Sequence, residues 1–375
     1  MFKRRLTQKI KDRLDNKDII ILYGARQVGK TTLLEEFLKD NPNALILNCE
    51  RSLVHDIFST KDLSQIEMLF ENKKYIALDE AQNINNIGKI LKLVYDELGN
   101  KYKIIATGSS SFELSNKIVE PLTGRNIKFH LYPLMISEIK EKNEWLWVKE
   151  QLNNFLLFGM YPEIIELPLL EKKEKLNALS SDYLFKDVLS HENIRNADIL
   201  RLLVKAIALQ IGSQVSFNEL ANFCKVSVNT VIKYLDLLEK TFVIFSLNSY
   251  SNNLRNEIKK SKKYYFYDLG IRNALINNFT PIQNRNDLGA LWENFCISER
   301  IKLNSIKQPF TNYYFWRTYD GAEIDLIEEN DGKLETFEFK WKLKGKIKLP
   351  NSFIEKYKVN KLNIVSKDNF HDYLL

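Results

Sequence analysis

Apolar runs separated by charged segments give the chain an alternation of strand-like and helix-like patterns. Near the amino end, residues 18–23 read DIIILY, a β-branched apolar run typical of a buried parallel strand. Residues 31–40 follow with apolar positions at helical spacing. Further apolar runs at 75–78 and 102–107 predict two more buried strands. The alternation predicts an α/β domain built on a parallel sheet.

The loop between the first strand and the first helix has the spacing of a phosphate-binding loop, because it matches G-x-x-x-x-G-K-[ST]. In such a loop, glycines let backbone N–H groups turn toward phosphate oxygens. Lys30 would reach the β- and γ-phosphates, and the Thr31 hydroxyl would ligate Mg2+. A chance glycine-rich turn is the alternative, and the strand before the loop and the helix after it speak against it. We therefore predict a nucleotide site formed by Gly24, Ala25, Arg26, Gln27, Val28, Gly29, Lys30, Thr31 and Thr32.

Two further strand ends carry candidate chemistry. Asp79 and Glu80 follow the run 75–78, where the aspartate can hold Mg2+ and the glutamate can polarise the attacking water. A solvated acidic pair that opens a loop is the alternative. Ser109 follows the next strand and could sense the γ-phosphate or simply cap a turn. The sequence lacks the Asn-Lys-x-Asp box of guanine-binding proteins, so we expect ATP and Mg2+ as cofactors.

Arg125 follows Gly124 near the end of the predicted P-loop domain. It could stabilise transition-state charge on a γ-phosphate, in its own subunit or in a neighbouring one. The alternative is a structural ion pair. A role in a neighbouring subunit would require a homo-oligomer, and dilution would then lower the specific ATPase activity.

The middle of the chain predicts a helix-turn-helix with a wing. Residues 217–248 show a short helix, a turn at 225–227, a longer helix from about Val228 to Glu239, and an apolar strand, and a second strand follows at 262–268. On the exposed side of the second helix we expect Asn229, Thr230 and Lys233. Basic residues that crowd the wing would suit DNA phosphates: Arg255, Lys259, Lys260, Lys262 and Lys263. Winged helices also serve as packing modules, and that alternative stays open.

Residues 287–366 show the order helix, three strands, helix, strand, which is the order of the PD-(D/E)XK nuclease fold. Asp325 lies on the second strand, and Glu338 and Lys340 lie two apart on the third, so strand alternation puts Glu338 and Lys340 on one face. The carboxylates can hold one or two Mg2+ ions, and the lysine can orient or help deprotonate a water. Two further acidic residues could add ligands: Glu293 on the helix, and Glu323 in reserve.

Length and composition narrow the class of protein. With 375 residues the chain has room for two or three domains. The charged start lacks the apolar stretch of a signal peptide, and no apolar run is long enough to span a bilayer. Three scattered cysteines suit a reducing compartment, so we expect a cytoplasmic protein without a membrane partner. The net charge of +7 permits a DNA partner but does not establish one.

Several segments resemble prokaryotic AAA+ family ATPases that carry a C-terminal nuclease-like domain. In chain order these are YGARQVGKTTLL, IALDEAQNI, ATGSSSFEL, LTGR, LYPLMISEI, FGMYPEII and YLFKDVL. The resemblance implies an AAA+ core, a helical lid and a domain similar to PD-(D/E)XK restriction-type nucleases. It also implies nucleotide roles for Lys30, Thr31, Asp79, Glu80, Ser109 and Arg125.

We therefore expect four regions: a P-loop AAA+ ATPase domain at 1–140, a helical lid at 141–200, a winged helix at 201–267 and a nuclease-like α/β domain at 268–375. Two functions remain open. The first is an ATP-hydrolysing enzyme that couples turnover to DNA binding or to metal-dependent DNA cleavage. The second is a nucleotide-controlled switch whose C-terminal domain only binds a partner.

Overall fold

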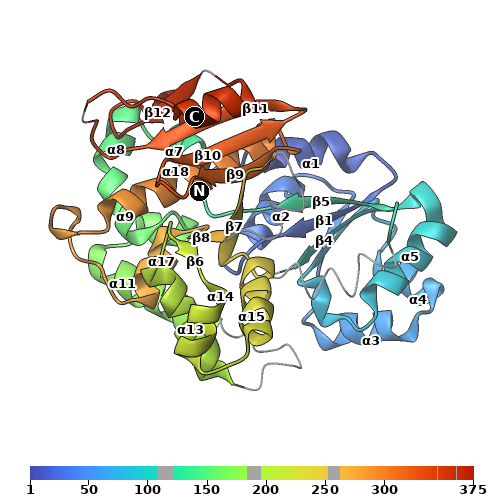
Figure 1. The fold of residues 1–375 in the computed structure, drawn as a ribbon. Coiled ribbons are helices and arrows are strands. Elements are labelled where there is room, and N and C mark those ends of the chain that lie inside the picture. The colour runs from blue at the N-terminus through green and yellow to red at the C-terminus, as the bar shows by residue number, and fades with distance from the viewer. Residues whose placement is uncertain (109–121, 184–195, 252–261, 344, 360) are drawn as a thin grey trace. The chain divides into compact units, whose positions relative to one another are not determined.

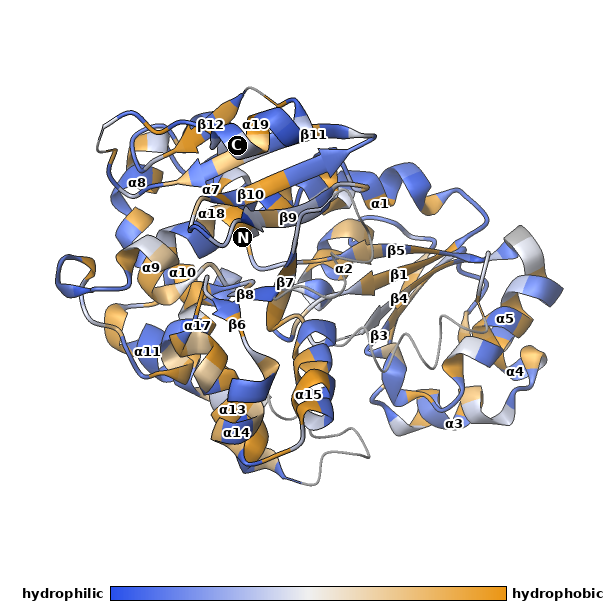
Figure 2. Ribbon diagram, viewed as in Figure 1, coloured by the Kyte–Doolittle hydropathy of each residue, from blue (hydrophilic) through white to orange (hydrophobic). Residues whose placement is uncertain are grey.

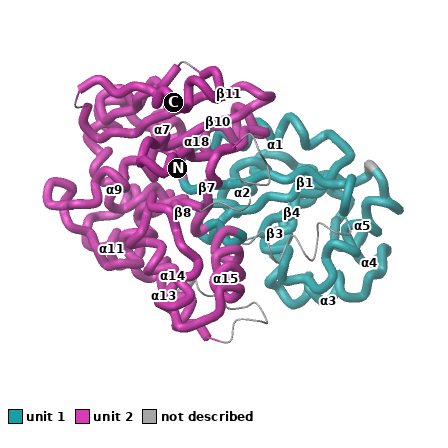
Figure 3. The backbone as a smooth tube through the Cα atoms, viewed as in Figure 1, with its two compact units in different colours: residues 1–133, 240–242 teal, residues 134–239, 243–375 magenta. Residues whose placement is uncertain are grey.

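The computed structural model describes residues 1–108, 122–183, 196–251, 262–343, 345–359 and 361–375 (Figure 1). The chain forms two compact units (Figure 3). Unit 1 comprises residues 1–133 and 240–242, and unit 2 comprises residues 134–239 and 243–375. Among the described helices, none combines the length and the apolar character that a bilayer crossing requires.

Unit 1 is built on a parallel sheet of five strands. In order across the sheet they are β2 (Ala44–Asn48), β3 (Tyr75–Asp79), β4 (Lys103–Gly108), β1 (Ile19–Tyr23) and β5 (Asn126–His130). Its helices are α1 (Leu6–Leu14), α2 (Lys30–Leu38), α3 (Ser52–Thr60), α4 (Leu63–Leu69) and α5 (Ile87–Leu98). Strands β1 and β4 are buried along their whole length and largely apolar (Figure 2), as befits central strands of a parallel sheet. The strands and the helix predicted for this region are confirmed.

Unit 2 contains a mixed sheet of seven strands. In order across the sheet they are β12 (Leu362–Val365), β11 (Lys333–Phe339), β10 (Glu323–Asn330), β9 (Asn312–Arg317), β7 (Ile244–Ser249), β8 (Lys262–Phe266) and β6 (Gln214–Val215). The helices that precede β6 in the chain are α7 (Ile136–Lys142), α8 (Trp145–Glu150), α9 (Leu152–Phe158), α10 (Pro162–Glu166), α11 (Leu169–Ala178) and α13 (Ala197–Leu209). The later helices are α14 (Phe217–Cys224), α15 (Val228–Lys240), α17 (Leu269–Leu275), α18 (Leu288–Lys307), α19 (Asn351–Tyr357) and α20 (His371–Leu374).

The predicted order of elements in residues 287–366 is confirmed, from α18 through β9, β10, β11 and α19 to β12. Strands β9, β10 and β11 form an antiparallel meander, and β12 pairs parallel to β11. The register of β9 and β10 shifts between Ile324 and Ile327, so β10 carries an irregularity of the β-bulge kind there. Strand β7 pairs parallel to β9 through Asn248 and Ser249, which continues the sheet into β8 and β6.

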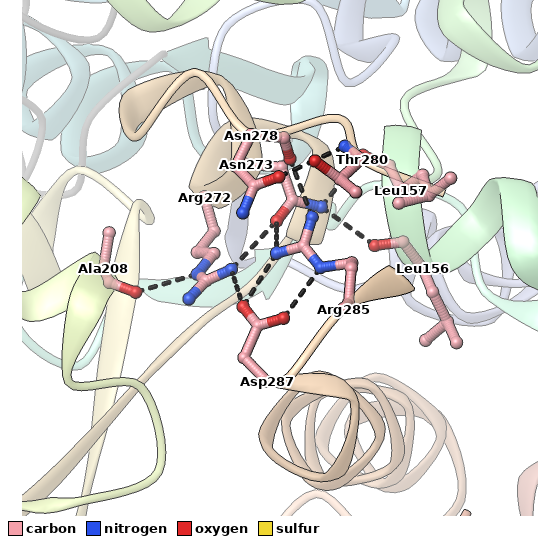
Figure 4. A network of polar contacts seen from close by, with 9 residues as sticks. All are labelled: Leu156, Leu157, Ala208, Arg272, Asn273, Asn278, Thr280, Arg285 and Asp287. Carbon is pink, nitrogen blue, oxygen red and sulfur yellow. Dashed lines mark hydrogen bonds and ion pairs between the residues drawn. The ribbon is translucent and has the colours of Figure 1, made fainter. Parts of the chain in front are cut away.

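A buried polar network fixes the start of α18 to earlier helices (Figure 4). Asp287 accepts hydrogen bonds of 2.7 Å from Arg272 and from Arg285. Arg272 also donates to the carbonyl of Ala208, at the end of α13. Asn273 donates to two carbonyls at the end of α9. Burial raises the pKa of Asp287, but the hydrogen bonds from the two arginines outweigh it and bring the value to about 2.

The GMYPE segment has a packing role. Gly159 ends α9 with φ +70, and a Cβ atom there would lie 1.9 Å from Oδ1 of Asp268. Asp268 accepts hydrogen bonds from the N–H groups of Met160 at 2.7 Å and Gly270 at 2.9 Å, so it also caps α17. The carboxylate is thus solvated by backbone groups from two segments, and only a glycine fits at position 159.

A fully buried ion pair on α18 contacts the first residue of α7 and Leu134, two residues before it. Glu299 and Lys302 pair at 2.9 Å, and neither side chain is exposed. Glu299 also accepts from the N–H of Ile136 at 2.7 Å, and Lys302 donates to the carbonyl of Leu134 at 3.3 Å. The LYPLMISEI segment is therefore held in place partly by charges from α18.

Candidate nucleotide site and acidic cluster

The phosphate-binding loop follows the carboxyl end of β1 and leads into α2, as predicted. A Cβ atom on Gly24 would lie 2.3 Å from the carbonyl oxygen of Leu131, so the loop passes too close to the next segment for any larger residue. Gly29 adopts φ +94 immediately before α2. Both glycines of the motif therefore have a backbone reason to be glycine.

Lys30 and Thr31 occupy positions suited to a nucleotide. The Lys30 ammonium is buried and donates to the carbonyls of Gly24 at 2.9 Å and Ala25 at 3.1 Å. The Thr31 hydroxyl donates to Oδ2 of Asp79 at 2.7 Å. Mg2+ prefers oxygen ligands such as a hydroxyl and a carboxylate. Thr31 and Asp79 therefore fit the ion that P-loop proteins bind with their nucleotide.

Thr107, near the carboxyl end of β4, is a candidate site residue that the sequence analysis does not name. Its hydroxyl donates to Oδ1 of Asp79 at 2.6 Å and accepts from the N–H of Glu80 at 3.1 Å. Glu80 itself adopts a left-handed backbone and accepts from the side chain of Gln82 at 2.5 Å. Thr107 thus couples the predicted magnesium ligand Asp79 to Glu80, the residue predicted to polarise the attacking water. A small hydroxyl at the end of an apolar strand was the signal that could have revealed it.

Arg4 was also missed, because nothing in its sequence context marks it. Its guanidinium is buried and donates to the carbonyls of Val28 at 2.7 Å and Tyr132 at 2.5 Å. Both acceptors are backbone atoms, and one of them lies inside the phosphate-binding loop. Arg4 therefore helps to fix the loop's conformation.

The remaining loop residues lie in the segment as expected. Ala25, Arg26 and Gln27 are half-buried, and Gln27 adopts φ +61. Thr32 is exposed in the first turn of α2. Their contact with a nucleotide stays a prediction.

Arg125 lies at the end of the sheet where the parallel strands begin, and the phosphate-binding loop lies at the other end, where they finish. It directly precedes β5, whose first residue Asn126 pairs with Ile19, the first residue of β1, whereas the loop follows the last residue of β1. Its guanidinium pairs with Asp96 at 2.9 Å. A role at the γ-phosphate of its own subunit is therefore disfavoured, and the structural ion pair is what the chain forms. Ser109 lies outside the described residues.

Unit 2 brings the predicted nuclease residues together. Asp325 lies in the irregular part of β10, and its Oδ2 accepts from the N–H of Phe339 at 2.8 Å. The Lys340 ammonium lies 2.7 Å from Oε1 of Glu338 and 3.4 Å from Oδ2 of Asp325. The strand alternation is confirmed, because Phe339 is buried in the core while Glu338 and Lys340 are half-buried. Two carboxylates and one lysine therefore meet at the end of β11.

Strand β8 adds two residues to this cluster. The Lys263 ammonium lies 3.4 Å from Oε1 of Glu293 and also pairs with Glu323. The Tyr265 hydroxyl donates to Oε1 of Glu293 at 2.6 Å. The prediction that Lys263 faces DNA phosphates from a wing is wrong, because the residue is 2% exposed and paired with acidic side chains. Glu323 is likewise held by a lysine.

Burial and like charge perturb the acidic residues. Burial, and then the charge of Asp325, raise the pKa of Glu293 to about 7, and the same two causes raise the pKa of Glu338. Burial lowers the pKa of Lys340, but Asp325 and Glu338 outweigh it and raise the value. Among the side chains that the structure describes, no group of three or more His, Cys, Asp and Glu is arranged to hold a metal ion. The carboxylates are instead bonded to ammonium groups.

The predicted helix-turn-helix elements are present as α14 and α15, joined by a turn at Lys225, which adopts φ +54. Asn229 and Lys233 are exposed on α15, while Thr230 is half-buried and its hydroxyl lies 2.8 Å from that of Ser227. Lys262 is half-buried. Three predicted basic residues lie outside the described part of the chain: Arg255, Lys259 and Lys260.

Comparison with protein families divides the chain into three matched segments. Residues 16–140 match the model of the AAA domain. Residues 149–282 and 288–373 each match a domain of unknown function, DUF8612 and DUF4143 respectively. An uncharacterized protein of Methanocaldococcus jannaschii is 28% identical over 88% of this chain and 76% of its own length. One of Mycobacterium tuberculosis is 26% identical over 90% and 74%.

Among solved structures, a Walker-type ATPase of Pyrococcus abyssi superposes with a TM-score of 0.50 at 19% sequence identity. The match covers 74% of this chain and 96% of that protein. At this identity the likeness shows the fold, an α/β architecture with a parallel sheet like that of P-loop ATPases. Together with the match of residues 16–140 to the AAA domain model, it supports an AAA-like P-loop ATPase fold for this part of the chain.

Proposed function

We propose that this chain hydrolyses ATP and couples turnover to DNA, which it binds through a winged helix at residues 201–267 and cleaves at Asp325, Glu338 and Lys340. The observation that carries the cleavage proposal is the meeting of these three side chains at an irregularity in β10. Irregular strand pairing beside polar side chains is common at active sites, because it aims a side chain out of the regular pleat.

The two carboxylates fit a single Mg2+. Proteins commonly hold this ion with one or two carboxylates, and water and substrate phosphate complete its coordination. An ion held there would polarise the scissile phosphate and lower the pKa of a bound water. The N–H of Phe339 would keep Asp325 oriented. Lys340 would direct the attacking water, since its ammonium already lies between both carboxylates.

The DNA-binding proposal is supported by the order of elements. Helices α13, α14 and α15 and strands β6, β7 and β8 follow the winged-helix sequence, and β8 pairs antiparallel with both other strands. In such folds the second helix of the helix-turn-helix reads the major groove. On α15, Asn229 and Lys233 are exposed and free to face a ligand on that side.

At the nucleotide site, binding would require Lys30 to exchange its bonds to the loop carbonyls for bonds to the β- and γ-phosphates. Thr31 and Asp79 would hold Mg2+, which supplies charge neutralisation at the phosphates. Glu80 would orient the attacking water, with its backbone fixed by Thr107.

A second candidate function is a nucleotide-controlled switch whose C-terminal part binds a partner without cutting it. One observation favours it: each of the four carboxylates of the cluster is paired directly with a lysine, either Lys263 or Lys340. A cluster whose carboxylates are all paired with cationic side chains can serve packing alone.

A DNA cleavage assay distinguishes the two functions. Wild type, Glu338→Ala and Lys30→Ala are incubated with linear, supercoiled and single-stranded DNA, with Mg2+ or Mn2+, with and without ATP. The enzyme proposal expects metal-dependent cutting by wild type, none by Glu338→Ala with its ATPase intact, and no ATPase in Lys30→Ala. The matched control is Glu335→Ala, an exposed glutamate on the same strand, which should cut normally. If wild type cuts no DNA under any condition, the switch proposal replaces the enzyme proposal.

A further inference from the structure

The acidic cluster receives a second lysine from an element that lies outside residues 287–366. Lys263 is on β8, and its ammonium contacts both Glu293 and Glu323. Tyr265, on the same face of β8, donates to Glu293 at 2.6 Å. Gly212 backs the same carboxylate, because a Cβ atom there would lie 3.4 Å from Oε1 of Glu293. Glu293 is therefore enclosed by the segment that precedes α18.

The two lysines divide the cluster into halves. Lys263 bridges Glu293 and Glu323, while Lys340 bridges Asp325 and Glu338. Glu323 also pairs with the Arg317 guanidinium at 3.7 Å, so four carboxylates face three cationic groups. The one formal negative charge that remains favours a single divalent ion over two. Lys340 is 42% exposed and can move aside, whereas the side chain of Lys263 is 3% exposed.

We propose that Lys263 is an internal cation that keeps divalent metal ions out of the Glu293–Glu323 half, so that the cluster accepts at most one ion, at Asp325 and Glu338. This proposal rests on the proposed function, because it assumes that Asp325 and Glu338 bind one divalent ion. Mg2+ binds oxygen ligands at about 2.0–2.1 Å, so an ammonium in contact with both carboxylates occupies the space that an ion would need. The Lys263 ammonium also lies over the ring of Phe315, 5.3 Å from its centroid, so displacing it would break a cation–π contact as well as both ion pairs.

The test counts Mn2+ ions per chain, by equilibrium dialysis or by the signal of free Mn2+ in electron paramagnetic resonance, without nucleotide. Lys263→Met removes the charge and nearly keeps the side-chain volume. We expect it to bind one more Mn2+ per chain than wild type, and to gain more in melting temperature from Mn2+. The matched control, Lys262→Met, changes the half-buried neighbour on the same strand and should bind as many ions as wild type.

Lys263→Met leaves two carboxylates without their ammonium partner, so its folding is checked by circular dichroism with and without Mn2+. Lys263→Gln is the second neutral variant, and its amide can still donate to both carboxylates. An equal ion count in wild type and in the folded neutral variant overturns the proposal. So does a pair of neutral variants that stay unfolded at millimolar Mn2+, because the ion then does not replace the ammonium.

The proposed metal site is judged separately, by comparing wild type with Glu338→Ala and leaving Lys263 unchanged. If wild type and Glu338→Ala bind equal numbers of Mn2+, the metal site at Asp325 and Glu338 fails. The difference between wild type and the Lys263 variants is still informative in that case. The two failures therefore produce different patterns of ion counts.

Discussion

Replacing Thr107 with valine should slow ATP hydrolysis while ATP still binds. Valine keeps the shape of threonine but removes the hydroxyl, which donates to Asp79 at 2.6 Å and accepts from the N–H of Glu80 at 3.1 Å. A hydrogen bond to a charged group contributes about 1.5–3 kcal/mol. If this contribution acts on the transition state, where Asp79 and Glu80 must be in place, kcat falls roughly 10- to 100-fold, since about 1.4 kcal/mol corresponds to tenfold in rate.

The assay is phosphate release at saturating ATP, with nucleotide affinity measured by a fluorescent ATP analogue. Thr60→Val is the control, because Thr60 is an exposed threonine at the end of α3. We expect KM and nucleotide affinity to change less than about threefold, as for an interaction made mainly in the transition state. A folded Thr107→Val variant with the kcat of wild type would refute the positioning role. A loss of nucleotide affinity with unchanged kcat would instead assign Thr107 to ground-state binding.

Two further predictions concern stability. Lys302→Met strands Glu299 in the core and should cost about 3–5 kcal/mol in the free energy of unfolding at pH 8. Burial raises the pKa of Glu299 and Lys302 opposes this rise, so removing the lysine should raise the pKa of Glu299 further. A group whose pKa is raised by folding costs no stability below its unfolded-state pKa, where it is protonated in both states, and costs most above its folded-state pKa. Urea melts of the variant should therefore show a smaller loss of stability at pH 5 than at pH 8. Gly159→Ala forces a Cβ to 1.9 Å from Asp268 at φ +70 and should cost at least about 3 kcal/mol. Gly289→Ala, in open space on α18, should cost nothing in the same melts, and equal effects of the two alanines would contradict the explanation.

The sequence predicts local features of the nucleotide site well. The strand before the loop, the helix after it and the carboxylate at the end of β3 are all visible as patterns over a few residues. Position within the sheet is not visible in this way. Arg125 directly precedes β5, and only the pairing of Asn126 with Ile19 reveals that it lies at the end of the sheet opposite to the loop. Thr107 and Arg4 escaped notice for the same reason, since their partners are distant in sequence.

The C-terminal prediction shows the same division. Strand alternation correctly places Glu338 and Lys340 together, because two residues on one strand need only the period of the pleat. Lys263 was assigned to a wing because basic residues crowd its neighbourhood in sequence. Its burial follows from the pairing of β7 with β9, which brings β8 beside the carboxylates, and no short-range pattern announces a pairing across more than sixty residues.

The pairing of β7 with β9 also limits where this protein can be divided into stable fragments. Strand β7 belongs to the segment that matches one domain model, and β9 belongs to the segment that matches another, yet they share one sheet. A fragment that starts at residue 288 would expose the backbone edge of β9, a template for aggregation, and would lack Lys263 and Tyr265. We expect such a fragment to be poorly soluble.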